Sequence, residues 1–370
     1  MKQRIIVSVI NDLNTDQRVH KMCLFMQSQG YAVLLVGRRM KSSSPMENRP
    51  YQTKRMKLLA ETGPLFYASF NFRLFWLLLF SRASILVAND LDTLLPNVLV
   101  SKLKGKRLVY DSHELFTEVP ELVKRPKVQA VWKRIERFCI PKVKMAITVN
   151  HSIQEKYETL YKIPFKVVRN VSPRFVPDKI KSKVELGLPE KPVLIMQGAG
   201  LNIDRGVDLI IQAMPFVDNA VLAIVGDGDV IPEMKVLVKE LGLEKKVLFF
   251  GKRPYTELLQ YTANATLGLS FDQPTNPNYL FSLPNKIFDY IHASTPILCS
   301  EVVEVKRIVE KYDLGEVVYD FEAKALANQI ERILSDTAQM EKWKNNCEKA
   351  STLEHWEKEV QQLTEFYPKV

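Results

Sequence analysis

Along the chain, short apolar runs of strand length alternate with segments whose apolar residues recur every three or four positions, as in a helix. The run at residues 5–10 precedes apolar residues at helical spacing between 19 and 26, and a second run follows at 31–36. A strand, a helix and another strand in this order predict a parallel sheet, whose strands are apolar throughout because helices cover both faces. The runs that predict the remaining strands of this first domain lie at 85–88, 107–110, 145–150 and 167–171.

The second half of the chain repeats this alternation. Its apolar runs lie at 193–197, 221–225, 247–250, 266–270 and 297–299. Residues 173–192, between the two halves, are polar and contain four prolines, which predicts a linker. We therefore expect an α/β protein with an N-terminal domain at 1–172, the linker at 173–192, a C-terminal domain at 193–350 and a helical segment at 351–370.

One apolar stretch is long enough to raise the question of a membrane segment. It runs from Leu74 to Phe80 and is bracketed by Arg73 and Arg82. A membrane-spanning helix needs about 20 apolar residues, so this run is too short. We predict a buried helix packed on the sheet, and an interfacial membrane helix is the alternative.

Composition and charge narrow the range of partners. The 370 residues carry a net charge of +10, and the four cysteines are far apart, which fits a reducing compartment better than a disulfide framework or a metal site. The first 170 residues contain 29 Lys and Arg against 13 Asp and Glu, whereas the remainder is acidic. Such a basic half favours an anionic partner, and the simplest alternative is a solvated face. No zinc-finger spacing or aromatic-basic signature suggests a nucleic-acid module, and a strand that starts at residue 5 leads us to expect no signal peptide.

The candidate catalytic residues of the first domain lie directly after one of its predicted strands. Asp111-Ser112-His113-Glu114 comes directly after the strand at 107–110, and ligands of open α/β sheets gather at the carboxyl ends of strands. His113 is the main catalytic candidate, because an imidazole can hydrogen-bond a substrate or take a proton near neutral pH. Glu114 could orient His113 or cap the next helix.

Two further positions of the first domain have a structural and a functional interpretation. Asp16 could cap the helix that follows it, and Arg18 could be solvated. Alternatively, either side chain could contact a substrate. The motif Asp90-Leu91-Asp92 suggests a divalent metal, but two carboxylates without a third ligand are weak evidence, so we expect a helix start here and no metal.

The second domain contains glycine-rich loops after two of its strands. Gly198 and Gly200 follow the strand at 193–197, and Gly226 follows the strand at 221–225. Glycines allow backbone N–H groups to approach a phosphate closely. In the stretch 282–298, a Leu-Pro-Asn-Lys loop leads into a helix that we expect to end before Thr295. A helix start of this kind attracts anions, and Lys286 adds a mobile positive charge.

Two of these segments resemble glycosyltransferase family 4, a group of GT-B enzymes. They are the Asp-Ser-His-Glu segment at 111–114 and the stretch 282–296, and weaker matches cover most of the chain in the same order. The resemblance implies two facing Rossmann-like domains with an inter-domain cleft. The first domain would bind the acceptor, the second would bind a nucleotide-sugar, and the last helix would cross back to the first domain. It also implies retention of the anomeric configuration and no requirement for a metal or another cofactor.

The resemblance also assigns roles to individual residues. His113 would contact the transferred sugar, whereas Asp16 and Arg18 would lie on the acceptor side together with Glu114. In the second domain, Arg205 would clamp the donor diphosphate and Asp289 would hold the ribose. Other donor-binding positions are Gly198, Gly200, Gly226, Arg253, Pro284 and Asn285.

The sequence departs from the family pattern at two positions. Phe281 stands at the first acidic position of the donor motif, and Ala199 stands where the family carries an arginine. Lys286 would replace that arginine as the second cation of the diphosphate clamp. The departures keep two alternatives open, which are a nucleotide-sugar epimerase and a catalytically inactive binding or scaffold protein.

The resemblance and the charge together suggest a setting. We expect a saccharide or lipid-linked saccharide acceptor in cell-envelope polysaccharide or glycoconjugate synthesis. We expect a cytoplasmic protein whose basic N-terminal domain could lie on the inner face of the plasma membrane, and no nucleic-acid partner.

Overall fold

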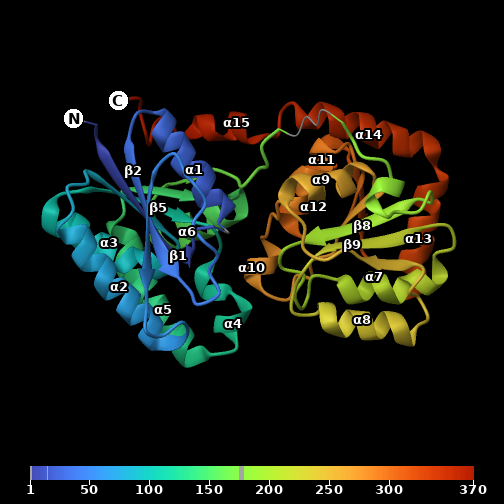
Figure 1. Ribbon diagram of the computed structural model, residues 1–370, viewed down its shortest axis with the longest axis horizontal. Helices are drawn as coiled ribbons and strands as arrows, with labels where there is room; N and C mark the ends of the chain where they lie inside the picture. The colour runs from blue at the N-terminus through green and yellow to red at the C-terminus, as the bar shows by residue number, and fades with distance from the viewer. Residues whose placement is uncertain (1, 15, 175–178) are drawn as a thin grey trace. The chain divides into compact units, whose positions relative to one another are not determined.

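The computed structural model describes residues 2–14, 16–174 and 179–370 (Figure 1). The chain divides into two compact units. The first unit extends to Asn170 and also contains Glu359–Val370, and the second unit is Val171–Lys358. The boundary at Asn170 lies two residues before the predicted end of the first domain.

The first unit is built on a seven-stranded sheet in the order β3-β2-β1-β4-β5-β6-β7, in which all pairs are parallel. The strands are β1 (Arg4–Asp12), β2 (Ala32–Arg39), β3 (Gln52–Lys57), β4 (Ile85–Asn89), β5 (Arg107–Ser112), β6 (Met145–Thr148) and β7 (Phe165–Val167). The helices are α1 (Gln17–Ser28), α2 (Gly63–Leu79), α3 (Leu91–Lys104), α4 (Pro120–Val123), α5 (Pro126–Cys139) and α6 (His151–Tyr161). The central strand β1 is buried over Ile5–Ile10, as its continuous apolar run predicts.

The second unit contains a six-stranded sheet in the order β10-β9-β8-β11-β12-β13, also with parallel pairs only. Its strands are β8 (Val193–Gly198), β9 (Val221–Gly226), β10 (Val247–Phe249), β11 (Leu267–Ser270), β12 (Ile297–Ser300) and β13 (Gly315–Val318). Its helices are α7 (Val207–Ala213), α8 (Ile231–Glu240), α9 (Tyr255–Ala263), α10 (Pro277–Leu280), α11 (Lys286–His292), α12 (Val303–Tyr312), α13 (Ala323–Ser335) and α14 (Thr337–Ser351).

Both sheets have the strand order of doubly wound dinucleotide-binding folds. In each, the chain reverses direction across the sheet between the first and the fourth strand of the unit, which are β1 and β4 in one and β8 and β11 in the other. Ligands of such folds bind outside the carboxyl ends of the strands at this switch point. The expectation of two Rossmann-like α/β units with parallel sheets is therefore confirmed.

The helix α2 differs from the prediction of a buried helix. Its buried positions are Phe66, Phe70, Leu74 and Leu78, which recur every fourth residue and form one face only. The opposite face is exposed, because α2 packs on the sheet from one side. The prediction of a buried helix is therefore right for the face that packs on the sheet and wrong for the opposite face, which is exposed.

Part of the predicted linker packs into the core of the second unit, whereas the last residues of the chain belong to the first unit. Leu186 and Leu188, inside the predicted linker, are buried with strands of the second unit. Residues 359–370 belong to the first unit, where the amide of Val370 donates to the carbonyl of Gln29 at 3.0 Å. The hydroxyl of Tyr31 also donates to the carbonyl of Pro368 at 2.9 Å.

Candidate functional site

In the first unit, the structure places His113 just beyond β5 and beside the end of β4. Its backbone amide donates to Oδ1 of Asp90 at 2.7 Å, and its ring Nδ1 lies 3.1 Å from Oδ2 of the same residue. Its Nε2 lies 3.4 Å from Oδ2 of Asp111. Asp90 therefore holds both the backbone and the ring of His113, and Nε2 has the longer, weaker contact.

The two carboxylates decide the charge of His113. Burial by itself disfavours the imidazolium, but Asp90 and Asp111 together outweigh burial and raise the pKa of His113 well above its usual range. The two carboxylates therefore favour the positively charged form of the ring. A charged imidazole donates hydrogen bonds and does not act as a base. Both ring nitrogens of His113 face protein carboxylates, and Nε2 is buried, so the ring presents a positive charge at this edge of the sheet and no free donor.

Asp90 itself has an unusual backbone conformation. Its φ is 57° and its ψ is 171°, a region that only glycine adopts readily. Its amide donates to the carbonyl of Asp111 at 2.9 Å, and both its carboxylate oxygens face His113. From the sequence, Asp90-Leu91-Asp92 was rejected as a metal site and expected to lie at a helix start, and the contact of Asp90 with His113 was not predicted. The positions of both residues at the ends of neighbouring strands could have indicated it.

Arg18 is not solvated, and the structure gives it a structural partner. Its side chain is 4% exposed and forms a two-pronged pair with Asp111, with Nη2 2.7 Å from Oδ1 and Nε 3.3 Å from Oδ2. Its Nη1 donates to the carbonyl of Val168 at 2.8 Å. Arg18 thus ties α1 to β5 and supports the carboxylate behind His113.

The other two predicted residues of the first unit are also engaged. The Oδ1 of Asp16 accepts from the amide of Val19 at 3.0 Å, as expected of a helix cap. The carbonyl of Glu114 accepts from the hydroxyls of Ser112 at 2.9 Å and Tyr157 at 3.2 Å. These contacts fix the loop that carries His113.

In the second unit, Arg205 and Lys286 meet at one buried carboxylate. Asp272 lies two residues beyond β11, and Arg205 lies in the loop after β8, so the group sits at the switch point of the sheet. Nη1 of Arg205 is 2.5 Å from Oδ2 of Asp272, and Nζ of Lys286 is 3.6 Å from Oδ1. The guanidinium of Arg205 also stacks on the ring of Tyr279 at 4.2 Å. Two cations share one anion, which leaves an excess positive charge.

Lys286 is less mobile than expected. Its side chain is buried, and burial followed by the nearby charge of Arg205 lowers its pKa, while Asp272 acts in the opposite direction. An anion that approached this site would stabilise the charged form of Lys286. Sequence reasoning placed Asp272 in a loop without a role, because nothing in its local pattern distinguishes it from other loop acids.

Glycines lie at the ends of β8 and β9 and in the loops that follow, and close packing requires a glycine at Gly226 and Gly228 but not at Gly200. Gly198 and Gly226 are paired across the strands, and a Cβ on Gly226 would lie 1.8 Å from the carbonyl oxygen of Gly198. A Cβ on Gly228 would lie 2.1 Å from the carbonyl oxygen of Leu201. By contrast, a Cβ on Gly200 would contact only the amide of Asn202, at 3.8 Å.

Asp289 is enclosed by side chains of its own unit. Its Oδ1 accepts from the hydroxyls of Ser172 at 2.6 Å and Tyr255 at 2.8 Å, and its Oδ2 accepts from the amide of Gln197 at 3.1 Å. Burial raises the pKa of Asp289, and the three hydrogen bonds only partly offset this. The structure therefore gives Asp289 three protein donors, and a ligand hydroxyl would have to replace one of them.

The remaining predicted donor-binding positions, Pro284, Asn285 and Arg253, lie in loops of the second unit near the carboxyl ends of its strands. Pro284 and Asn285 directly precede α11, and Pro284 is partly buried whereas Asn285 is exposed. Arg253 is exposed beyond β10, where its Nε donates to the carbonyl of Phe250 at 3.0 Å. Among residues 2–14, 16–174 and 179–370, no three His, Cys, Asp or Glu side chains form a cluster that could hold a metal ion. In the same ranges, no helix combines the length and the apolar character needed to span a bilayer.

Two family models match consecutive parts of the chain. The model "Glycosyltransferase Family 4" matches residues 16–172, and the model "Glycosyl transferases group 1" matches residues 178–350. The chain is a GT-B glycosyltransferase that resembles family 4. This GT-B glycosyltransferase is 25% identical over 216 residues to the uncharacterized glycosyltransferase MJ1607 of Methanocaldococcus jannaschii. That match covers 55% of the chain and about half, 54%, of the relative.

Solved structures share the fold of this glycosyltransferase over its whole length. Sucrose-phosphate synthase from Thermosynechococcus elongatus is 18% identical with a TM-score of 0.81, over 99% of this chain and 98% of that chain. Anabaena HepE in complex with UDP and glucose is 16% identical with a TM-score of 0.74, over 100% of both chains. WaaG, described as a glycosyltransferase involved in lipopolysaccharide biosynthesis, is 16% identical with a TM-score of 0.72, over 99% of this chain and 100% of that chain.

Proposed function

We propose that the protein transfers a sugar from a nucleotide-sugar to a saccharide or lipid-linked saccharide, with retention of configuration and without a metal ion. The observation that carries this proposal is the meeting of Arg205 and Lys286 at the buried Asp272, at the switch point of the second sheet. Two cations that share one carboxylate are suited to bind a diphosphate, because the anion supplies the missing negative charge.

In the proposed reaction, the bond between the anomeric carbon and the diphosphate oxygen breaks, and a bond to the acceptor oxygen forms on the same face. The acceptor proton passes to the departing phosphate. Arg205 and Lys286 stabilise the negative charge that develops on the leaving diphosphate, which is electrostatic preorganisation. Because these side chains already supply positive charge, we expect turnover to be insensitive to EDTA.

The role of His113 in this proposal follows from its charge. As an imidazolium held by Asp90 and Asp111, it would place a positive charge beside a hydroxyl of the transferred sugar. Its contribution would be to orient the sugar. His113→Gln, which keeps a donor but no positive charge, should therefore lower turnover without abolishing donor binding.

A thermal-shift screen would test donor binding. UDP is the first ligand to try, because HepE was solved with UDP and with UDP-glucose, followed by GDP, ADP and their sugars. A ligand that binds only the folded state raises the melting temperature. We expect one nucleotide to raise it in the wild type and much less in Arg205→Met. No shift with any nucleotide at millimolar concentration would count against the donor site.

Two alternatives have separate tests. An epimerase would convert the nucleotide-sugar in the absence of an acceptor, which analysis of the sugar product would reveal. An inactive scaffold is suggested by Phe281 and Ala199, which stand where the family carries an acid and an arginine. A scaffold would bind the nucleotide-sugar yet neither hydrolyse nor transfer the sugar.

The proposed setting is cell-envelope polysaccharide or glycoconjugate synthesis in the cytoplasm, at the inner face of the membrane. Support comes from the charge distribution, since the first 170 residues hold 29 Lys and Arg against 13 Asp and Glu. Anionic lipids attract such a surface. Salt-sensitive binding to anionic vesicles would support this setting.

A further inference from the structure

The outer face of α2 carries an exposed row of aromatic side chains. Phe72, Trp76 and Phe80 are 64%, 43% and 78% exposed and recur at intervals of four residues, so they lie along one side of the helix. Trp76 stacks on Phe80 with ring centroids 5.7 Å apart, and Phe72 meets Trp76 edge-on at 6.1 Å. We call these three residues the aromatic ridge. Soluble monomers rarely expose contiguous apolar surface of this kind without a function.

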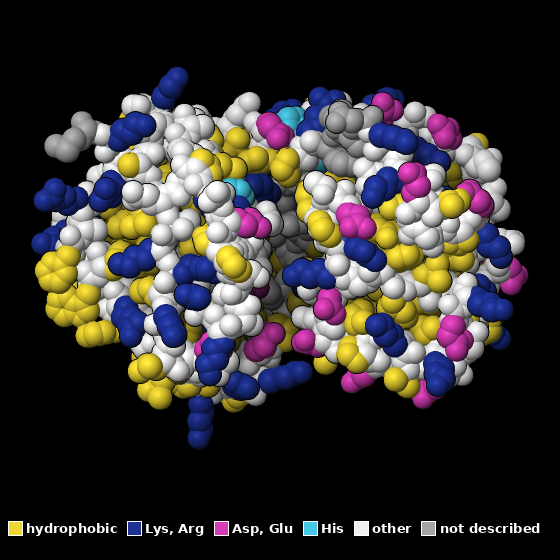
Figure 2. All heavy atoms as spheres, viewed as in Figure 1, with side chains coloured by type: hydrophobic (Ala, Val, Ile, Leu, Met, Phe, Trp, Pro, Cys, Tyr) yellow, Lys and Arg dark blue, Asp and Glu magenta, His cyan; other side chains and the backbone are white. Residues whose placement is uncertain are grey.

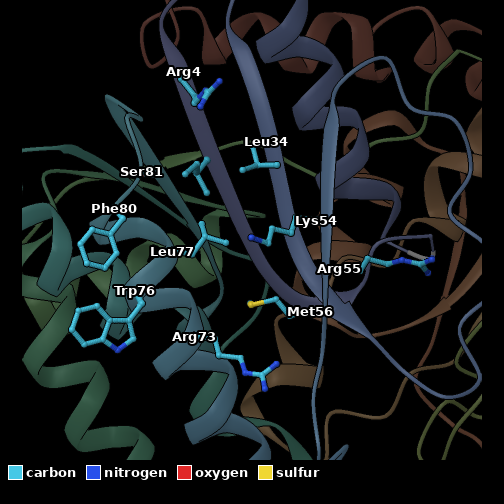
Figure 3. A pocket seen from close by; sticks show the side chains of 11 residues that line it. Arg4, Leu34, Lys54, Arg55, Met56, Arg73, Trp76, Leu77, Phe80 and Ser81 are labelled. Atoms are coloured by element: carbon cyan, nitrogen blue, oxygen red, sulfur yellow. The ribbon is translucent and has the colours of Figure 1, made fainter.

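A pocket of about 640 Å³ lies between α2 and the strands β1, β2 and β3 of the first sheet (Figure 3). Its apolar lining includes Leu34, Met56 and Leu77, and its basic lining includes Arg4 and Lys54. Figure 3 shows the side chain of Lys54 pointing toward α2, between the strands and Leu77. Trp76 and Phe80 of the aromatic ridge also line the pocket, so apolar and basic groups form one continuous surface.

The basic side chains of this pocket are available to a ligand. In the part of the chain that the structure describes, the side chains of Arg4 and Lys54 are exposed and form no hydrogen bond or ion pair. Their neighbours differ, since Arg55 lies 3.6 Å from Asp12 and Arg73 donates to the carbonyl of Lys57 at 2.6 Å. Arg4 and Lys54 are therefore the two positive charges that an incoming anion would meet.

The sequence around the aromatic ridge contains almost no acidic residues. Residues 48–60, 62–89 and 93–110 lack Asp and Glu entirely, although they contain many Lys and Arg. The last turn of α3, which packs beside α2, carries Lys102 and Lys104 next to the exposed Leu103. Figure 2 shows Lys and Arg side chains among hydrophobic ones over this part of the first unit. A surface that is both apolar and positively charged complements an anionic lipid bilayer.

We propose that the aromatic ridge and the basic pocket form a membrane-docking surface for bilayers that contain anionic lipids. Aromatic rings favour the boundary between headgroups and acyl chains, and α2 would lie in the plane of that boundary. Arg4 and Lys54 would bind the phosphate of a lipid headgroup in the pocket. This proposal rests on the membrane setting of the proposed function and assigns it to a specific face. That face differs from the carboxyl-end edge of the sheet where His113 lies.

Trp76 offers a direct probe of docking. The other three tryptophans, Trp132, Trp343 and Trp356, are buried, so Trp76 is the one that solvent reaches. We would titrate the full chain with vesicles of phosphatidylcholine, alone or with phosphatidylglycerol, and record tryptophan fluorescence. The proposal predicts a blue shift, and quenching by brominated lipid, with anionic vesicles only. No spectral change at low salt, or an equal change with neutral vesicles, would overturn it.

Sedimentation with the same vesicles measures separately how much the aromatic ridge and the basic pocket contribute to binding. Trp76→Ala with Phe80→Ala should reduce partitioning about tenfold or more, because two aromatic anchors are lost. Arg4→Glu with Lys54→Glu should weaken it by at least about fivefold per residue, because each basic group near an anionic surface contributes about 1 kcal/mol. Trp76→Phe should still sediment with vesicles but lose the fluorescence change.

Matched controls on the second unit test whether the effects are specific. Phe216→Ala removes another exposed aromatic ring, and Lys245→Glu reverses another exposed charge. Both should partition as the wild type does. If they weaken binding as much as the variants of the aromatic ridge, non-specific attraction explains the result and the proposal fails.

Three further measurements distinguish loss of docking from unfolding, from dimer dissociation and from loss of the donor site. Circular dichroism must show that each variant is folded. Sedimentation velocity without lipid distinguishes a membrane surface from an interface between copies, since a dimer that dissociates in Trp76→Ala with Phe80→Ala would contradict the proposal. Nucleotide binding, measured without vesicles, should be unchanged in these variants. Loss of vesicle binding with intact nucleotide binding therefore concerns this surface and leaves the donor site untouched.

Discussion

The buried pair of Arg18 and Asp111 gives the sharpest prediction about stability. The pair connects α1 to the end of β5, and Arg18 is 4% exposed while Asp111 is fully buried. Arg18→Met keeps much of the side-chain volume but removes three hydrogen bonds, two to Asp111 and one to the carbonyl of Val168. It leaves Asp111 with His113 as its remaining close cation, at 3.4 Å.

Removal of one partner of a buried ion pair costs about 3–5 kcal/mol, because the other charge stays buried without compensation. Domains are stable by only about 5–15 kcal/mol, so the first unit should lose a large part of its stability. For a domain of this size, that loss corresponds to a fall in melting temperature of about 6–20 °C. The melting temperature of Arg18→Lys should lie between those of the wild type and Arg18→Met, since lysine keeps the charge but not the two-pronged geometry.

The pH dependence has a definite sign. Burial opposes ionisation of Asp111, but Arg18 and His113 outweigh burial and lower its pKa. A carboxyl group whose pKa is lower in the folded state contributes stability above its unfolded pKa, about 3.9, and the contribution is lost as the pH falls below that value. The wild type should therefore lose stability below about pH 4 more steeply than Arg18→Met.

The assay is urea unfolding followed by hydrogen exchange of peptides from β1 and β5, which reports on the first unit alone. Arg39→Met, on an exposed arginine of β2, is the matched control and should change stability by less than about 0.5 kcal/mol. The double variant Arg18→Met with Asp111→Asn should recover part of the loss, because it removes both charges. If the double variant loses as much stability as the sum of the losses in Arg18→Met alone and Asp111→Asn alone, the reasoning is refuted.

Two other predictions follow from the geometry of the sites. Gly226→Ala should destabilise the second unit by about 2–4 kcal/mol, because its Cβ would lie 1.8 Å from the carbonyl oxygen of Gly198, whereas Gly200→Ala should have little effect. Calorimetry that finds equal melting temperatures for both variants would contradict this. Asp90→Asn should lower the pKa of His113, since it removes one of the two carboxylates that raise it. NMR titration of the histidine ring protons measures this, and an unchanged or higher pKa would be inconsistent with it.

The strands were the most predictable part of the fold. The runs that form β1, β2, β4, β5, β8, β9 and β11 are largely apolar because both faces of their sheets are covered. Two edge strands, β3 and β13, were not predicted. β3 reads Gln-Thr-Lys-Arg-Met-Lys and is largely exposed, so its pattern resembles that of a loop. Pairing with β2 makes it a strand, and such pairing is not visible in local sequence.

The candidate site was predictable where a residue follows a strand directly. His113 was identified in this way and lies at the carboxyl edge of its sheet, whereas Arg205, in the longer loop after β8, was identified from the family resemblance. Their partners were not identified, because Asp90 and Asp272 are 23 and 67 residues away in sequence. Only the order of strands brings them together.

Burial of charged side chains was the main source of error. Arg18 was expected to be solvated or to face an acceptor, and Lys286 was expected to be mobile. Both are buried because a carboxylate on another element compensates their charge. A single sequence shows that a charge is present but not which distant residue pairs with it.

The central claim is that Arg205 and Lys286 bind the diphosphate of a nucleotide-sugar. Isothermal titration calorimetry with UDP and with UMP tests it most directly, with GDP or ADP in place of UDP if the screen selects them. Arg205→Met and Lys286→Met should each weaken diphosphate binding by about 1.5–3 kcal/mol, roughly 10–150-fold, and reduce the preference for diphosphate over monophosphate. Lys239→Met, on an exposed lysine of α8, should bind as the wild type does. Unchanged diphosphate affinity in both Arg205→Met and Lys286→Met would contradict the account.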